Sequence, residues 1–176
     1  VQVNMAEGLV KHAYEILARE WPLAMPFDEL CGKAVEQSGL PAGGHADILA
    51  ADLMKLYTAK AIDLRRKPSP FTVSVGEKPM VSPLTRLQAN KGHLVTNMLH
   101  EVANINEPTR LLLRMLDGKS DHAALLEKLL ELVNSGELVL REDGVEIGDK
   151  TKQHQYIKQF LEKILAELGK RALLVA

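Results

Sequence analysis

The fold class follows from residues 107–147, EPTRLLLRMLDGKSDHAALLEKLLELVNSGELVLREDGVEI. Apolar residues in the first part recur at helical spacing, and Asp117-Gly118 ends that pattern. A second helical pattern follows, with Ser120 as its predicted N-cap. Gly136 ends it, because a helix commonly stops at a left-handed residue and glycine adopts that conformation most easily. This stretch therefore predicts two consecutive helices.

A hairpin is predicted directly after these two helices. Leu138 and Leu140 alternate with Val139 and Arg141 as in a strand, and Asp143-Gly144 is a strong two-residue turn signal before a returning strand at 145–147. Helix, helix and two-stranded hairpin, in that order, are typical of a winged-helix module. After the hairpin, the sequence predicts a long last helix that is capped by Asp149 and carries a continuous apolar stripe.

The same apolar pattern occurs earlier in the chain. Residues 53–64, LMKLYTAKAIDL, align without a gap on residues 129–140, LLELVNSGELVL. Any helix–turn–strand joint can give such a pattern, but each copy also has helices before it and a charged hairpin after it. We therefore predict a mainly α protein with short β-hairpins (α+β), built from two tandem winged-helix-like modules. The first wing is expected at 62–66 and 71–75.

Two prolines mark the predicted boundary between the modules. Pro79 and Pro83 limit helix on either side of the stretch 76–83, which divides the chain into modules at 1–78 and 79–176. In the first module, Trp21 is the only tryptophan and is predicted to anchor the core. A ligand-stacking role is the less favoured alternative for it.

Composition limits the class of protein. The chain has 176 residues, a net charge of −1 and one cysteine, Cys31, which excludes an intramolecular disulfide. No apolar run is long enough for a membrane span, and no signal peptide is recognisable. These features favour the cytoplasm. The chain starts at Val1, without a methionine and inside an expected helix start, so we expect either a fragment of a longer protein or a protein that stands alone.

The charges argue against nucleic-acid binding, although the predicted topology permits it. A helix that reads a groove needs several Lys or Arg side chains to neutralise phosphates. The helix before the first wing is nearly neutral, and the helix before the second wing is acidic. Only the first wing is basic, at Arg65, Arg66 and Lys67, and a solvated charge run explains these residues more simply.

Signals for catalysis and metal binding are weak. The histidines are scattered without the paired spacing of metal ligands, and His100-Glu101 is the nearest approach to it. Cys31 is expected to be a small core residue. We find no nucleophile elbow and no phosphate loop. The sequence therefore predicts no catalytic residue, no cofactor-binding residue and no metal site in this chain.

The stretch SPLTRLQANKGHLVTNMLHE, residues 82–101, is the best candidate for an interaction site. It places polar side chains in a connecting region, where rigid modules commonly present binding groups. The alternative is that these side chains satisfy backbone groups at the junction of the modules. The candidate interaction residues are Arg86, Gln88, Asn97, His100 and Glu101.

The same stretch carries a family resemblance. Residues 82–89, Val95-Thr96-Asn97, His100-Glu101, Arg110-Leu111-Leu112 and Leu116-Asp117-Gly118 resemble the non-catalytic tail of a bacterial methyltransferase family. Those proteins begin with a class I S-adenosylmethionine-dependent domain, continue with a methyltransferase regulatory domain and end in a winged-helix domain. Some are protein-lysine methyltransferases that act on outer-membrane proteins. The resemblance covers nearly the whole chain.

The resemblance does not extend to a catalytic domain. The family's cofactor site needs a strand, a Gly-rich turn and an acidic residue, and no such stretch occurs here. The resemblance therefore implies a regulatory or substrate-positioning region without enzyme activity of its own, with S-adenosylmethionine expected only in an attached catalytic domain. The implied partners are that catalytic domain, in cis or in trans, and a protein substrate. A transcription-factor-like nucleic-acid binder and a plain protein-interaction scaffold remain the alternatives.

Overall fold

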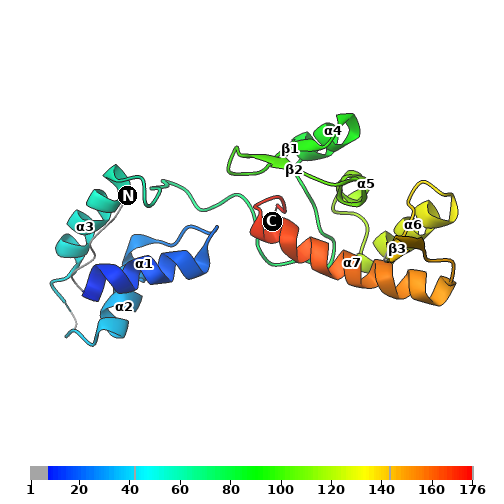
Figure 1. Cartoon of the computed structure of the whole chain (residues 1–176). Helices are drawn as coiled ribbons and strands as arrows, with labels where there is room; N and C mark the ends of the chain where they lie inside the picture. Colours follow the sequence, from blue (N-terminus) through cyan, green and yellow to red (C-terminus); the bar gives the residue numbers. More distant parts are fainter. Residues whose placement is uncertain (1–7, 42, 143, 176) are drawn as a thin grey trace. The chain divides into compact units, whose positions relative to one another are not determined.

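The chain forms helices and short hairpins in two compact units. The computed structural model describes residues 8–41, 43–142 and 144–175. Within these residues it contains seven helices and two antiparallel hairpins (Figure 1). One unit ends at Ser69 and the other begins at Pro70. The α+β class predicted from the sequence is confirmed.

The first unit is built from three helices, α1 (Gly8–Glu20), α2 (Phe27–Ser38) and α3 (Ala46–Thr58). Apolar positions at helical spacing bring one face of each helix into a common core. Helix α2 follows Pro26 and ends at Gly39, whose positive φ of 67° lets its N–H bond to the Glu36 carbonyl. The buried core residues are Leu9, Val10, Ala13, Ile16, Leu30, Ala34, Leu49, Leu53 and Leu56.

The predicted repeat holds at the ends of two helices. Lys60 follows α3 with φ of 58°, and its N–H bonds to the Tyr57 carbonyl at 2.9 Å. Gly136, the aligned residue, follows α6 (His122–Asn134) with φ of 80°, and its N–H bonds to the Val133 carbonyl at 3.2 Å. The two aligned segments therefore make the same left-handed turn.

The first wing does not form, and the prediction of strands at 62–66 and 71–75 is wrong. Pro68 and Pro70 have no N–H to donate to a ladder, which disfavours pairing across this loop. The second segment pairs elsewhere instead: the Thr72 N–H donates to the Leu174 carbonyl at 3.1 Å, and Val75 packs against the core of the second unit. Residues 70–75 therefore belong to the second unit, with the C-terminal segment.

The second unit follows the predicted order closely. It contains α4 (Pro83–Lys91), β1 (Leu94–Thr96) paired with β2 (Val102–Asn104), α5 (Glu107–Met115) and α6. A short wing of β3 (Arg141–Glu142) and β4 (Val145–Glu146) precedes α7 (Lys150–Lys170). The helix, helix, hairpin order read from residues 107–147 is confirmed. In the turn of the wing, Gly144 has φ of 83°, whereas Asp143 lies outside the described residues.

The helix caps of this unit are local signals, and the cap predicted at Asp149 is confirmed. Asn106 Oδ1 accepts from the Thr109 N–H at 3.0 Å, and Asp149 Oδ1 accepts from the Lys152 N–H at 2.9 Å. The prediction of Ser120 as the cap of α6 is wrong by one residue. Asp121 caps that helix through the Ala124 N–H at 2.8 Å, because it occupies the position directly before the first helical residue, and Ser120 accepts from Lys128 instead.

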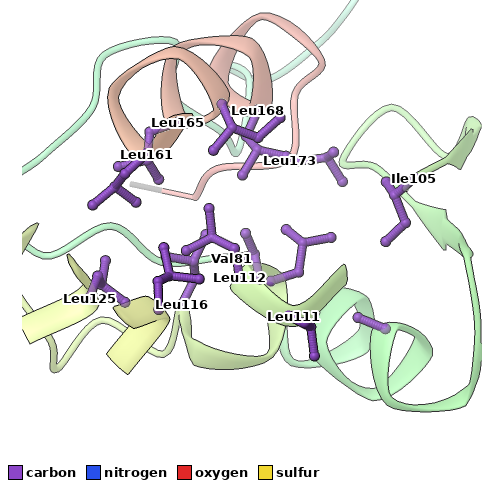
Figure 2. Packing of buried hydrophobic residues seen from close by; sticks show 14 of the residues in the cluster. Val81, Ile105, Leu111, Leu112, Leu116, Leu125, Leu161, Leu165, Leu168 and Leu173 are labelled. Carbon is purple, nitrogen blue, oxygen red and sulfur yellow. The ribbon is translucent and has the colours of Figure 1, made fainter. Parts of the chain in front are cut away.

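The core of the second unit gathers around α5 and α7 (Figure 2). Helix α7 buries most of the stripe predicted for it, with Leu161, Leu165 and Leu168 turned toward Leu112, Leu116 and Val81, whereas Tyr156 at its start is 43% exposed. Residues 80–81 run between two other segments of the unit: the Val81 N–H bonds to the Leu116 carbonyl, and the Val175 N–H bonds to the Met80 carbonyl. The predicted junction at 76–83 thus lies inside the second unit.

The prediction that Trp21 anchors the core of the first unit is wrong. Its side chain is 59% exposed and does not anchor the core. Helix α1 ends at Glu20, and the chain turns so that Pro22 is buried while Trp21 points outward.

No helix in the described part of the chain combines the length and the apolar character that crossing a membrane requires.

Candidate functional site

Helix α4 and the β1–β2 hairpin carry the candidate interaction residues, and hydrogen bonds fix the two elements together. Ser82 caps α4 by accepting from the Thr85 N–H at 3.1 Å, with Pro83 at the first helical position. The Thr85 hydroxyl, which is almost fully buried, donates to the Thr96 carbonyl at 3.0 Å. The start of α4 is thereby tied to the end of β1.

Gln88 makes the second tie between α4 and β1. Its Nε2 donates to Thr96 Oγ1 at 3.0 Å, and its Oε1 accepts from the Thr96 N–H at 2.8 Å. Both ends of the amide are therefore occupied by one residue. This geometry makes Gln88 a positioning residue, because its hydrogen-bonding groups already have partners inside the unit.

Asn97 organises the turn between β1 and β2. It is only 7% exposed, and its Oδ1 accepts from the N–H groups of Leu99 and Glu101, both at 2.9 Å. Its Nδ2 donates to Glu101 Oε2 at 2.9 Å and to the Arg171 carbonyl at 3.0 Å. One side chain therefore fixes the hairpin turn and joins it to the end of α7.

His100 and Glu101 are the exposed residues of this turn. His100 has a positive φ of 63°, which the turn imposes, and its N–H donates to the Asn97 carbonyl at 3.1 Å. Its imidazole is exposed. The structure thus brings Asn97, His100 and Glu101 together in one turn and places Gln88 on the adjoining helix.

Arg86 belongs to a different contact. Its Nε is buried and has no hydrogen-bond partner among the described residues. Its charge acts on Asp117, whose pKa is held below the ordinary value chiefly by the Lys119 N–H and additionally by Arg86. Arg86 therefore sits on the side of α4 that meets the end of α5, apart from the hairpin turn.

Exposed apolar side chains accompany these polar groups on the same helix and hairpin. Four large side chains are exposed: Leu84 and Leu87 on α4, each at 53%, Leu94 on β1 at 61% and Val102 on β2 at 71%. We call these four residues the α4–hairpin surface. Sequence reasoning missed it because it searched for polar groups. The available signal was that apolar residues occupy both faces of the hairpin, since Val95 and Ala103 fill the buried face.

The remaining chemistry of the unit is sparse. Within residues 8–41, 43–142 and 144–175, no group of three His, Cys, Asp or Glu side chains is arranged to hold a metal ion. Cys31 is half-buried and packs against the core of the first unit, beside the fully buried residues that the sequence predicted it to join. An ion pair joins Glu107 to Arg110 on α5, and it lowers the pKa of Glu107 through the hydrogen bond that Arg110 donates. The Arg110 guanidinium also bonds to the Ala89 carbonyl, so this pair supports the packing of α5 on α4.

Comparison with known proteins places this arrangement in a family context. A family model described as the PKMT C-terminal winged helix domain matches residues 77–173. The structure of PKMT2 from Rickettsia typhi resembles this chain with a TM-score of 0.78 and 18% identity, covering 97% of this chain and 35% of that one. The same protein in complex with AdoHcy gives a TM-score of 0.77 at 18% identity, covering 96% and 34%.

A curated relative is similar to this chain in sequence over a shorter range. An uncharacterized protein of Rickettsia prowazekii (strain Madrid E) is 30% identical over 101 residues, which are 56% of this chain and 18% of that protein. At 18% identity, the two solved structures establish likeness of fold alone. The chain spans about a third of PKMT2 and less than a fifth of the curated relative.

Proposed function

This chain belongs to the family of the C-terminal winged helix domain of PKMT, the protein lysine methyltransferases, and from that premise we propose that it positions a protein substrate for a methyltransferase catalytic domain. The observation that carries the proposal is the family match over residues 77–173. That match is to a winged helix domain and not to a catalytic one. The region is methyltransferase-associated, and its positioning role is what we add.

The α4–hairpin surface supports this role. Its four apolar side chains would lose contact with water on binding a partner, and burial of such groups stabilises association by roughly 25 cal/mol per Å² before the costs of association. Gln88 and Asn97 hold the surface in a fixed shape without being available to the partner. His100 and Glu101 in the hairpin turn are the polar groups that we propose for contact beside it, whereas Arg86 lies on the side of α4 that meets the end of α5.

Cofactor and place of action complete the proposal. S-adenosylmethionine binds to the partner catalytic domain, and this chain contributes no cofactor ligand. The chain acts in the cytoplasm, where a single unpaired cysteine fits a reducing compartment. The catalytic domain is a partner in cis or in trans.

The direct test compares a PKMT catalytic domain alone with the same domain fused ahead of this chain. We expect the fusion to lower the KM for a folded protein substrate by about tenfold or more, while kcat for a short lysine peptide stays unchanged, because positioning adds binding without altering the chemical step. Equal KM values for the protein substrate with and without the chain would contradict the proposal.

Matched variants locate the surface. Leu84→Ser with Leu87→Ser should raise the KM of the fusion toward that of the catalytic domain alone. Val139→Ser with Val145→Ser removes two side chains that are 46% and 72% exposed near the wing, and it should leave KM unchanged. If the two double variants behave alike, the α4–hairpin surface is not the binding surface.

The winged-helix topology also raises nucleic-acid binding as an alternative, which the charges disfavour. Glu127 and Glu131 on α6 and its capping residue Asp121 accompany Lys128, whose ammonium already bonds to Ser120 at 2.7 Å. Duplex DNA should therefore not be retarded by micromolar protein at about 150 mM salt, where exposed charges are screened beyond roughly 8 Å. A retardation that is lost when Arg65, Arg66 and Lys67 are replaced by alanine would favour nucleic-acid binding over substrate positioning.

A further inference from the structure

The first unit contains a hollow that the methyltransferase role does not use. It has a volume of about 490 Å³ and lies between the ends of α1 and α3 and the segment that leads into α2. Leu17, Leu30 and Leu53 of the three helices contribute to its walls, together with Trp21. Ligand pockets in proteins commonly measure about 300–1,000 Å³ and are lined mainly by apolar side chains.

The edge of this hollow exposes unusually large apolar groups. Trp21 is 59% exposed, Leu64 is 53% exposed and Phe27 is 38% exposed, and all three line the hollow. Tryptophan is highly buried on average, so a tryptophan left in water beside a cavity carries an avoidable cost. Clusters of this kind are typical of a surface that binds a partner.

Hydrogen bonds hold the edge in shape. Ser69 Oγ accepts from the Ala24 N–H at 3.2 Å and from Arg65 Nη1 at 3.3 Å. These two bonds join the segment after α3 to the segment between α1 and α2. In that second segment, the Leu23 N–H also donates to the Glu20 carbonyl at 2.9 Å. The walls of the hollow are therefore tied to each other and do not depend on a ligand for their arrangement.

Charge indicates what the hollow would accept. Arg65 lines it, and Arg66 and Lys67 continue from it along the chain, all three exposed. In the described part of the protein, none of the three forms an ion pair with a carboxylate. Asp63 is the one carboxylate among the residues that line the hollow. The hollow thus combines an apolar floor with an edge of three cations that form no ion pair within the described residues.

The length of this cationic edge favours a chain-like ligand. Consecutive Cα atoms are about 3.8 Å apart, so Arg65, Arg66 and Lys67 extend over up to about 8 Å beyond the hollow. A ligand that fills the hollow and reaches this edge must be extended and must change from apolar to acidic along its length. Duplex DNA fits less well, because its bases are stacked inside the double helix, so it would offer phosphates to the three cations but no apolar group to the floor.

We propose that this hollow is a docking site for an extended peptide in which an aromatic or aliphatic side chain is flanked by acidic residues. The apolar side chain occupies the hollow beside Trp21, and the carboxylates meet Arg65, Arg66 and Lys67. The site lies wholly within the first unit, so it does not depend on the proposed substrate-positioning role of the methyltransferase-associated region.

The only tryptophan of the chain reports on this site directly. We would titrate the 176-residue chain with the acetylated hexapeptide DELFED and follow tryptophan fluorescence. A saturable shift to shorter wavelength is expected, with a dissociation constant on the order of 100 µM or tighter. The peptides KKLFKK and DEGGED, which lack the acidic groups and the apolar groups respectively, should each bind at least about tenfold more weakly.

Variants separate a docking site from a general charge effect. Arg66→Ala with Lys67→Ala, which leaves the Arg65–Ser69 bond intact, should weaken DELFED binding by about fivefold or more. Lys150→Ala with Lys152→Ala removes two exposed charges from α7 and should change it by less than about twofold. Ala18→Phe places a ring at an exposed position that lines the hollow, and it should abolish the fluorescence shift.

Each other outcome overturns the proposal. No saturable change up to about 1 mM DELFED, or equal binding of KKLFKK, would show that the edge does not select acidic peptides. A shift of tryptophan fluorescence on adding duplex DNA, but not on adding DELFED, would show that Arg65, Arg66 and Lys67 bind nucleic acid. Sedimentation showing a dimer that Ala18→Phe dissociates, without peptide binding, would make a second copy of the chain the occupant.

Discussion

Gly169 on α7 is the position where one added methyl group should be most costly. A β-carbon built there would lie 2.5 Å from the Val73 carbonyl oxygen and 3.1 Å from the Val73 Cα, whereas ordinary contact begins at 3.4 Å. The obstacle is backbone, which cannot rotate away as a side chain can. The segment around Val73 would have to retreat by roughly 0.9 Å, the difference between the ordinary contact distance and the clash.

The magnitude follows from opposing terms. Alanine is favoured over glycine inside a helix by about 0.5–1 kcal/mol. Overpacking costs about 1–3 kcal/mol, and displacement of the segment puts at risk the Thr72 N–H bond to the Leu174 carbonyl, worth about 1 kcal/mol. We therefore expect Gly169→Ala to lower the free energy of unfolding of the second unit by about 1–3 kcal/mol, or to lower its Tm by roughly 4–20 °C.

Gly32→Ala is the matched control. Gly32 lies inside α2, and a β-carbon there would meet nothing within 4 Å. The same substitution should therefore stabilise the first unit by about 0.5–1 kcal/mol. Denaturation followed by tryptophan fluorescence reports on the first unit, which holds Trp21, and far-ultraviolet circular dichroism reports on both. A Gly169→Ala protein as stable as the parent would refute the close packing of α7 on residues 72–75.

Three further predictions concern single contacts. Asn97→Ala should lower the free energy of unfolding of the second unit by about 2–4 kcal/mol in urea denaturation, because it leaves two N–H groups of the turn and the Arg171 carbonyl without the partner that they have in the folded protein; a loss below about 0.5 kcal/mol would contradict its role in the turn. Lys60→Gly should stabilise the first unit by roughly 1 kcal/mol and Gly136→Ala should destabilise the second by a similar amount, since both positions have positive φ; effects of the same sign would refute the equivalence of the two turns. The pKa of Glu107 is lowered from its ordinary 4.5 by the hydrogen bond from Arg110, so its contribution to stability is present above that value and is lost as pH falls through the lower folded pKa; Glu107→Gln should flatten the part of the stability curve below pH 4.5, and an unchanged curve would argue against the pair.

The comparison of sequence with structure is clearest at the candidate site. Reasoning from the sequence singled out Gln88 and Asn97 as polar residues in a connecting region, with two possible roles. The structure gives both side chains internal partners, Thr96 for one and the turn with Arg171 for the other. The Arg171 carbonyl is 74 positions away along the chain. No local pattern could indicate that contact, because it depends on where α7 ends in space.

What the sequence determined by itself were features set by neighbouring residues. The side chains of Asn106 and Asp149 cap their helices through N–H groups three residues ahead, and Gly136 ends α6 through its own backbone freedom. Periodicity of apolar residues likewise fixed which faces of α5, α6 and α7 would be buried. These signals are local, so the order helix, helix, hairpin in residues 107–147 follows from the sequence alone.

Only the tertiary structure decided where longer segments find partners. The segment around Thr72 and Val75 has strand-like composition, but it pairs with the C-terminal residues and not with 62–66, since a strand needs a partner whose free N–H and C=O groups lie in register. Trp21 is exposed because Pro22 occupies the inner position after α1 ends. Its side chain then borders a hollow shared by three helices, and that hollow exists only once their faces have packed together, because burial depends on distant residues meeting in space.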